Sequence, residues 1–222
     1  MVTCFLNMTN GSVFGKIPME SRPKAEMGRA GICIVLRIRR NGMEIKRLEK
    51  EAYAGRTFTA RYHTGGYYDI CVSESGFQLN YTPFETTVER SFDDAFFGEW
   101  LEAPVAFGAF ERGTLIGYVE GSLESWNNRF RISNICVFDD SERGHGVGAA
   151  LMDAIQQAAE ATGARMIVLE TQSCNEAAIG FYRKNGFRVI GFDLYAYSNT
   201  DPERHEVRIE MGKKLPLGGS PE

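Results

Sequence analysis

Three closely spaced glycines, Gly144, Gly146 and Gly148, are the residues whose spacing most directly suggests chemistry. They follow a strand-like segment and precede a helix-like one. The first turn of a helix has backbone N–H groups with no partner inside the helix, and the helix dipole adds positive charge there. Glycines have no Cβ that would keep an anion away from those groups. The run therefore predicts a diphosphate site at the entry of a helix, with a ligand-free helix entry as the alternative.

The spacing of these glycines disfavours two familiar nucleotide sites. The pattern is G-x-G-x-G, whereas the dinucleotide fingerprint is G-x-G-x-x-G. No Lys-Ser or Lys-Thr pair follows Gly148, as a P-loop would require. Neither a nicotinamide dinucleotide nor a nucleoside triphosphate is therefore the expected ligand.

The segment from Arg143 to Gly148 reads Arg-Gly-His-Gly-Val-Gly and resembles the R/Q-x-x-G-x-G/A signature of the GNAT N-acetyltransferases. A second block further along the chain is similar to the streptothricin-acetyltransferase branch of that family. The resemblance covers about residues 77–212. The residues that carry the second block are Leu169, Glu170, Thr171, Gln172, Asn175, Ala178, Phe181, Tyr182, Asn185, Gly186 and Phe187.

The resemblance implies an α/β fold of the GNAT type, with a mixed, mostly antiparallel sheet flanked by helices. It also implies acetyl-CoA as cosubstrate, with no metal. In the family, the glycine loop binds the pyrophosphate, and the end of the preceding strand offers free backbone N–H groups. The residues expected to bind acetyl-CoA are Cys136, Val137, Phe138, Arg143, Gly144, His145, Gly146, Val147, Gly148, Ala149, Asn175 and Tyr182.

Acetyl transfer to an amine needs a base for the amine and benefits from an acid for the leaving thiolate. The resemblance places Tyr182 beside the coenzyme sulfur as that acid, and a packing role is the alternative. Glu120 lies within a strand-like segment and is the candidate general base. An exposed strand carboxylate is the alternative for Glu120, and Glu170 or a water relay is an alternative source of the base.

The acceptor side departs from the family pattern. Streptothricin acetyltransferases tend to carry an acidic Glu-Asp pair on the central strand, where this chain has Ser133-Asn134. The candidate substrate residues are Trp126, Asn134 and Tyr197. The acidic balance of residues 43–222 suits a cationic amine as acceptor, and the resemblance implies a small one such as an antibiotic. A protein N-terminus or lysine is the second hypothesis, and a non-catalytic acyl-CoA-binding module is the third.

Hydrophobic periodicity predicts the elements that must position these residues. The strands are expected to form antiparallel hairpins followed by a β-α-β-α-β run, which gives a mixed sheet with helices on its faces. Segment 83–97 is expected to be partly helical. Strands are expected at 43–48, 67–72, 77–81, 105–110, 115–123, 129–138, 164–171, 187–197 and 205–211, and helices at 49–55, 148–162 and 175–185.

Charge and composition set the remaining expectations. Residues 1–42 hold seven Lys or Arg and two Asp or Glu, so we expect them to be a disordered or non-native extension, with Met43 as the start. The N-acetyltransferase domain is then 43–216, with a flexible tail at 217–222. An acidic chain with a net charge of -4 does not favour nucleic-acid binding.

Apolar runs, cysteines and histidines indicate the compartment and the partners of the protein. No apolar run approaches the ~20 residues of a membrane span. The five scattered cysteines predict free thiols and a cytoplasmic protein, and the three separated histidines make a metal site unexpected. The sequence leaves a homodimer open.

Overall fold

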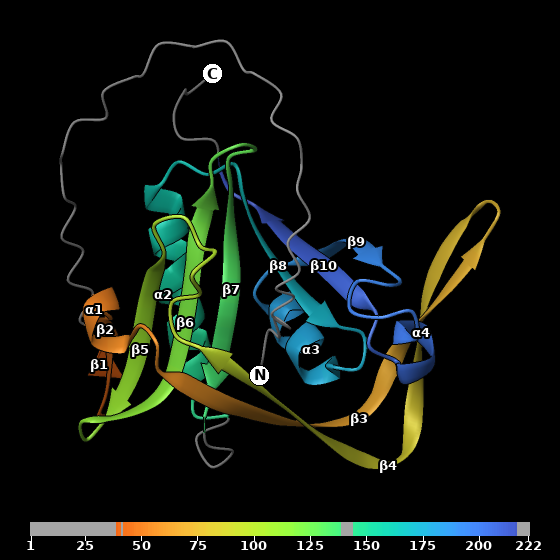
Figure 1. Cartoon of the computed structure of the whole chain (residues 1–222), viewed down its shortest axis with the longest axis horizontal. Coiled ribbons are helices and arrows are strands. Elements are labelled where there is room, and N and C mark those ends of the chain that lie inside the picture. Colours follow the sequence, from red (N-terminus) through yellow and green to blue (C-terminus); the bar gives the residue numbers. More distant parts are fainter. Residues whose placement is uncertain (1–38, 41, 139–143, 217–222) are drawn as a thin grey trace.

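The computed structural model describes residues 39–40, 42–138 and 144–216, and its main feature is an eight-stranded sheet in the order β1-β2-β5-β6-β7-β8-β10-β9 (Figure 1). All neighbouring strands are antiparallel except β7 and β8, which are parallel. The predicted mixed, mostly antiparallel sheet is therefore confirmed. Its strands are β1 Arg39–Arg40, β2 Met43–Arg47, β5 Val105–Glu111, β6 Thr114–Glu124, β7 Arg129–Val137, β8 Met166–Gln172, β9 Arg188–Asp193 and β10 Arg208–Lys214.

The short strand β1 belongs to the segment expected to be a disordered or non-native extension. Arg39 pairs with Glu44 and Arg40 pairs with Met43 at the edge of the sheet. Met43 is therefore not the first residue of the sheet. Residues 1–38 and the expected tail at 217–222 lie outside the described residues.

Strands β7 and β8 separate from each other soon after they begin. They pair only from Arg129–Met166 to Arg131–Val168. The register of β7 on β6 shifts at the same level, because Glu120 pairs with Asn134 and Gly121 pairs with Ile132. Ser133 is thus the extra residue of a β-bulge, which bends a strand. Beyond the bulge, β7 continues along β6, while β8 continues along β10.

Helix α2, Val147–Ala161, packs on β5, β6 and β7. Its apolar stripe, which includes Val147, Leu151 and Ile155, is buried in the main core. Gly117 of β6 allows this close packing, because a Cβ there would lie 3.0 Å from both the Cys136 carbonyl oxygen and Leu151 Cδ1. The predicted helix is confirmed, with its start one residue earlier.

Helix α3, Glu176–Lys184, has the predicted end signals. Asn175 Oδ1 accepts a hydrogen bond of 3.2 Å from the Ala178 N–H, as an N-cap does. Gly186, just past the end, has a left-handed φ of 86°. Ala178, Ile179 and Tyr182 of this helix belong to the same apolar core as α2. The other helices, α1 Lys50–Tyr53 and α4 Asp201–Arg204, are single turns.

A long two-stranded hairpin, β3 Thr57–Ser73 and β4 Gly76–Ala95, forms a separate sheet. The expectation that 83–97 is partly helical is therefore wrong. Residues 83–95 form a strand because they pair with Thr57–Gly66 of β3, and this distant partner outweighs their local helical pattern. Figure 1 shows the hairpin running from the β5–β6 side past the ends of β8 and β10 and projecting beyond α4.

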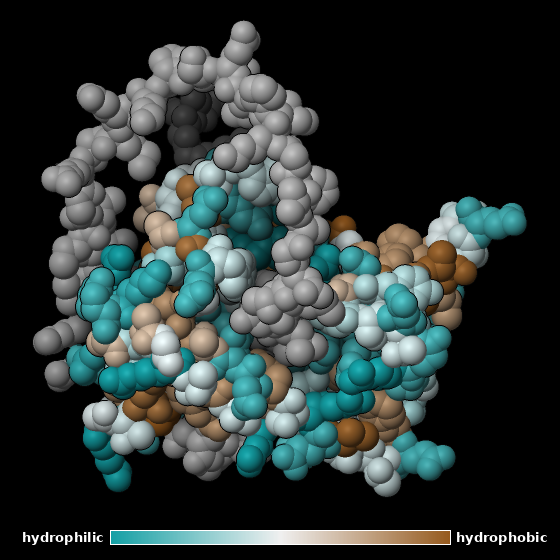
Figure 2. All heavy atoms as spheres, viewed as in Figure 1, coloured by the Kyte–Doolittle hydropathy of each residue, from teal (hydrophilic) through white to brown (hydrophobic). Residues whose placement is uncertain are grey.

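The base of the hairpin covers the sheet face opposite α2. Successive residues of a strand point to opposite faces. Tyr118 lies in the cluster with Phe58, Tyr62 and Phe96, whereas Val119 lies in the main core with α2. The far end of the hairpin is more open, and Figure 2 shows hydrophobic residues there just behind a hydrophilic tip. No helix in the described part of the chain is long and apolar enough to cross a membrane.

Candidate active site

The entry of α2 has the backbone that the glycine spacing predicted. Gly144 and Gly146 have φ values of 85° and 88°, in the left-handed region that favours glycine. A Cβ added to either residue would meet no atom of the described residues within 4 Å, so these residues leave the space beside this loop open. Gly146 is the N-cap and makes no side-chain capping bond, and the first turn carries no acidic residue. A diphosphate therefore fits here on both shape and charge.

The other residues of this loop differ in their surroundings. His145 is exposed, Val147 is buried and Ala149 is half-buried. A Cβ on Gly148 would lie 3.6 Å from the Phe181 ring, so the helix entry faces α3. Arg143, the first residue of the signature, lies outside the described residues.

The end of β7 corrects one detail of the expected acetyl-CoA contacts. The Phe138 N–H donates to the Ile116 carbonyl oxygen at 3.0 Å, so it points to β6. Backbone N–H groups alternate in direction along a strand, so the Val137 N–H points toward the gap where β8 has moved away. The expectation of a free N–H thus fits Val137 and not Phe138. The Cys136 side chain lies on the hairpin face, in the cluster around Tyr118.

Glu120, the candidate base, is only 1% exposed and lies in a buried polar cluster. Its Oε2 accepts the Phe97 N–H at 2.9 Å and also the Tyr118 hydroxyl proton. Its Oε1 accepts from Asn134 Nδ2 at 3.2 Å. Asn134 Nδ2 also donates to Asp94 Oδ2 at 2.9 Å. The structure thus joins the predicted base to the predicted substrate residue Asn134, and it adds Asp94 from β4.

Burial dominates the electrostatics of this cluster. It raises the pKa of the Glu120 carboxyl, although hydrogen bonds from Tyr118, Asn134 and Phe97 oppose the rise. It also raises the pKa of Asp94 and that of the Tyr118 hydroxyl. No lysine, arginine or histidine among the described residues contacts either carboxylate. Within the part of the chain that the structure describes, these two acids have no counter-charge.

Glu170, the alternative base, is held by cations. Arg131 Nη1 and Arg208 Nη1 each lie 3.7 Å from its Oε2. Burial raises the pKa of the Glu170 carboxyl, and the two arginines and a hydrogen bond from Tyr197 oppose the rise. Arg131 further pairs with Glu124 at 2.6 Å. The contacts therefore indicate a structural ion network across β6, β7, β8 and β10.

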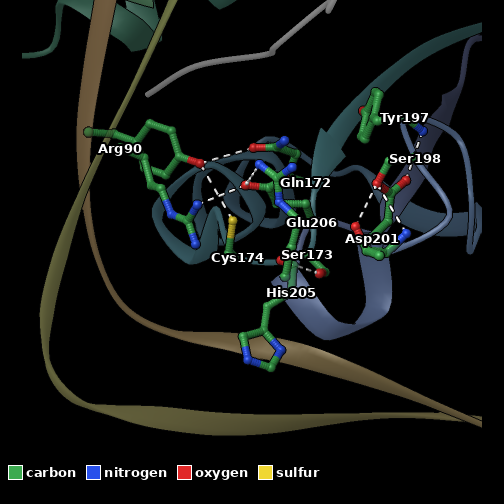
Figure 3. Close-up of polar contacts among 12 residues, drawn as sticks. Arg90, Gln172, Ser173, Cys174, Tyr197, Ser198, Asp201, His205 and Glu206 are labelled. Atoms are coloured by element: carbon green, nitrogen blue, oxygen red, sulfur yellow. Dashed lines mark hydrogen bonds and ion pairs between the residues drawn. The ribbon is translucent and has the colours of Figure 1, made fainter.

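The remaining predicted residues lie in different places. Tyr182 is fully buried in the apolar core, with its ring centroid 5.7 Å from that of Phe181 and 6.1 Å from that of Phe187. Trp126 is 81% exposed in the β6–β7 turn, at the end of β7 where β8 is still paired. Tyr197 lies beside α4, and its N–H donates to Asp201 Oδ2 at 2.7 Å (Figure 3). Trp126 is thus not brought together with the Glu120 cluster.

A second polar cluster, between the hairpin and the C-terminal half, was missed from the sequence (Figure 3). The Tyr62 hydroxyl donates to Gln172 Oε1 at 3.2 Å and lies 3.6 Å from Cys174 Sγ. Arg90 Nη1 donates to Glu206 Oε1 at 2.7 Å. Burial raises the pKa of the Cys174 thiol, which disfavours a reactive thiolate. No local sequence signal could have found these contacts, because they depend on the hairpin register.

Comparison with known proteins agrees with this geometry. The model of the acetyltransferase (GNAT) family matches residues 61–187. Streptothricin acetyltransferase of Streptomyces lavendulae is 29% identical over 159 residues, which cover 68% of this chain and 84% of that protein.

Two solved structures have the same fold. The crystal structure of a nourseothricin acetyltransferase matches 79% of this chain and 99% of its own, at 27% identity and a TM-score of 0.64. The structure of a candidate streptothricin acetyltransferase from Bacillus anthracis, in complex with acetyl coenzyme A, matches 78% of this chain and 99% of its own. At 23% identity and a TM-score of 0.60, the latter likeness concerns the fold alone.

Proposed function

The chain belongs to the GNAT acetyltransferase family, and from this premise we propose that it transfers the acetyl group of acetyl-CoA to a primary amine of a small cationic compound. One observation carries the proposal. The left-handed glycine entry of α2, open to an anion, follows the strand end at which β7 has parted from β8. A phosphate site and unpaired strand N–H groups are what a coenzyme A thioester needs along its length.

The proposed coenzyme site has three parts. The N–H groups of the first turn of α2, from Val147 to Ala149, bind the pyrophosphate together with the Gly144–Gly146 loop. The Val137 N–H binds the pantetheine arm or the thioester oxygen, and Asn175 adds a side-chain contact from the start of α3. Acetyl-CoA, when bound, supplies a thioester carbonyl carbon as the electrophile.

Glu120 and Tyr182 have complementary roles in the proposed reaction. Glu120 takes a proton from the ammonium group of the acceptor, and the neutral nitrogen then bonds to the carbonyl carbon. The carbon–sulfur bond breaks, and Tyr182 donates its hydroxyl proton to the departing sulfur. The second proton of the nitrogen returns to the Tyr182 oxygen. The products are an acetamide and free coenzyme A, and Glu120 carries the net proton released.

The acceptor class follows from charge. Glu120 is buried and Asp94 is half-buried, and no lysine, arginine or histidine of the described ranges contacts either of them. Such carboxylates suit an ammonium group, and residues 43–222 are acidic overall. The relative from Streptomyces lavendulae is named for streptothricin, so streptothricin is the first acceptor to test. The replacement of the family's acidic pair by Ser133-Asn134 favours a different amine as the best substrate, with Asn134 and Tyr197 as candidate contacts.

The proposal is tested with Gly146→Asp and a matched control. Aspartate tolerates a left-handed φ, so the fold should survive, but its carboxylate would compete with a phosphate for the helix N–H groups. Gly163, at the other end of α2, has a φ of 70° and equal open space, so Gly163→Asp imposes a similar backbone strain. We expect coenzyme A affinity by calorimetry to fall at least about tenfold in the first variant only.

The activity assay measures thiol release from acetyl-CoA with streptothricin, simple alkylamines and lysine peptides. Turnover with small amines and not with peptides supports the proposal. Coenzyme A binding of the wild-type protein without turnover on any amine would favour the non-catalytic module. Equal coenzyme A affinity in wild-type and Gly146→Asp protein would refute the phosphate site.

A further inference from the structure

The hairpin end and the centre of the sheet meet at one buried amide. Asn134 of β7 directs its Nδ2 to Glu120 Oε1 at 3.2 Å and to Asp94 Oδ2 at 2.9 Å. Each hydrogen of this NH₂ group thus has its own carboxylate. Since both neighbours are acceptors, the amide can only present its nitrogen to them.

From this geometry we infer that Asp94 and Asn134 are positioning residues for Glu120, so that the β3–β4 hairpin supplies part of the catalytic machinery. The inference rests on the proposed role of Glu120 as base. Asp94 acts through Asn134, whose amide fixes the orientation of the Glu120 carboxylate. Asp94 also acts through its charge, because it is a second, half-buried acid beside the buried Glu120.

The hairpin contributes to the Glu120 environment twice. Phe97, two residues beyond the end of β4, donates its N–H directly to Glu120 Oε2 at 2.9 Å. Asp94 is itself fixed, because the Ala95 N–H donates to its Oδ1 at 2.7 Å. A movement of this end of the hairpin would therefore change two of the groups around the carboxylate at once.

Hydrogen-bonding and charged groups from several elements face the Glu120 carboxylate. These are Tyr118 on β6, Asn134 on β7, Asp94 on β4 and the Phe97 N–H. The three donors favour the ionised carboxylate, whereas burial and the negative charge of Asp94 disfavour it. With Asp94 neutral, the pKa of Glu120 should fall, and Glu120 would be a weaker base at neutral pH.

If the role of Asp94 were merely structural, its replacement would affect stability and not the titration of Glu120. Loss of a structural hydrogen bond would lower the melting temperature without moving the titration of another residue. Asp93 offers the matched control, because it is adjacent in β4 but exposed, and it accepts a hydrogen bond of 2.6 Å from Thr59 on the outer side of the hairpin. Asp93→Asn removes the same charge from the same strand without facing Glu120.

The test is a carboxyl-carbon NMR titration of the full chain labelled at glutamate. The Glu120 signal is assigned as the one missing from Glu120→Gln. We expect its midpoint to move down by about half a pH unit or more in Asp94→Asn and to stay in place in Asp93→Asn. Asn134→Leu, which removes a donor to Glu120 but keeps Asp94, should move the midpoint up instead. An unchanged midpoint in folded Asp94→Asn overturns the inference.

If Asp94→Asn does not fold, Asp94→Ser is titrated instead, and the same downward shift of the Glu120 midpoint is expected. Kinetic measurements then distinguish the positioning role of Asp94 from the base role of Glu120. With streptothricin as probe, the acidic limb of the kcat/KM profile should move to lower pH in Asp94→Asn. Full activity of Glu120→Gln would instead refute the base role of Glu120, whereas an unmoved NMR midpoint refutes the positioning role of Asp94 and leaves the acetyltransferase proposal standing.

Discussion

At the scale of single residues, the two proposed proton carriers lie in very different surroundings. Glu120 is surrounded by hydrogen-bond donors on the hairpin face of the sheet, whereas Tyr182 lies among apolar side chains in the main core. A carboxylate needs donors to stay ionised when buried, while a tyrosine can remain neutral in an apolar site. The donors around Glu120 thus oppose the rise in its pKa that burial causes, whereas the proposed role of Tyr182 needs a neutral hydroxyl.

We predict that Tyr182→Phe lowers kcat by about 10²-fold, because the departing thiolate loses its proton donor. Phenylalanine fills the same space, so the melting temperature should change little. The measurement is kcat at saturating acetyl-CoA and acceptor, in a regime where chemistry limits the rate.

Tyr68→Phe serves as its control. The Tyr68 hydroxyl of β3 accepts a hydrogen bond of 2.9 Å from Arg183 of α3, the helix that also carries Tyr182. Tyr68 has no proposed chemical role. Its kcat should be near that of the wild type. A Tyr182→Phe enzyme equally close to wild type would remove Tyr182 from the role of acid.

The sequence predicted the polar cluster around Glu120 only in part. The strand pattern and the family resemblance point to Glu120 and Asn134, which are hydrogen-bonded in the structure. The sequence does not point to Asp94, because the pattern of 83–97 predicts a partly helical segment. Its approach to Asn134 depends on the register of the hairpin and on how the hairpin crosses the sheet, and neither is encoded locally.

At the scale of elements, local signals predicted α2 and α3 well. The N-cap at Asn175 and the left-handed Gly186 are determined by residues within a few positions of each helix end. The hairpin was predicted only in part: the strands expected at 67–72 and 77–81 lie within β3 and β4, whereas 83–97 was expected to be partly helical. The stabilising contacts of the hairpin strands, such as Tyr62 with Gln172, join residues more than 100 positions apart.

The N-cap of α3 gives a prediction that separates stability from coenzyme binding. Asn175→Ala removes the acceptor of the Ala178 N–H and should lower the free energy of unfolding by about 1 kcal/mol. Asn175→Asp keeps an oxygen acceptor and should restore that stability. It lacks the amide N–H₂, so the KM for acetyl-CoA should rise about 2- to 10-fold if this group donates to the pantetheine arm.

Urea unfolding and acetyl-CoA saturation curves measure the two effects independently. An Asn175→Asp protein with normal stability and a normal KM would assign Asn175 to capping alone. The direction of the stability change in Asn175→Ala would still hold in that case.

At the scale of the whole molecule, the hairpin connects the two halves of the sheet where β7 and β8 part. Its base packs on Tyr118 and Cys136 of the first half. Its middle contacts the second half through Tyr62 and Arg90, and the Gly65 N–H donates to Glu176 of α3 at 2.7 Å. The Phe77 ring near the tip packs edge-on against Phe192 of β9, with centroids 4.7 Å apart.

The Arg90–Glu206 pair is the charged contact of this connection. The Glu206 side chain is 10% exposed, and Arg204 lies 3.0 Å from its other oxygen. Arg90→Met would leave Glu206 buried with one cation, which should cost about 1–3 kcal/mol of unfolding free energy. Lys46→Met is the matched control, because it breaks a surface pair with Glu44 that should be worth about 1 kcal/mol or less.

Amide hydrogen exchange would identify the part of the structure that Arg90→Met destabilises. The Tyr68 N–H, which donates to the Ser173 carbonyl oxygen at 2.9 Å, should exchange faster, while amides in α2 should keep their wild-type rates. Since α2 carries the phosphate site, coenzyme A affinity should be preserved while the KM of the acceptor rises. Equal acceleration in α2 would mean that the hairpin and the main core unfold as one cooperative unit, and that acceptor and coenzyme sites cannot be separated by changes in this strand pair.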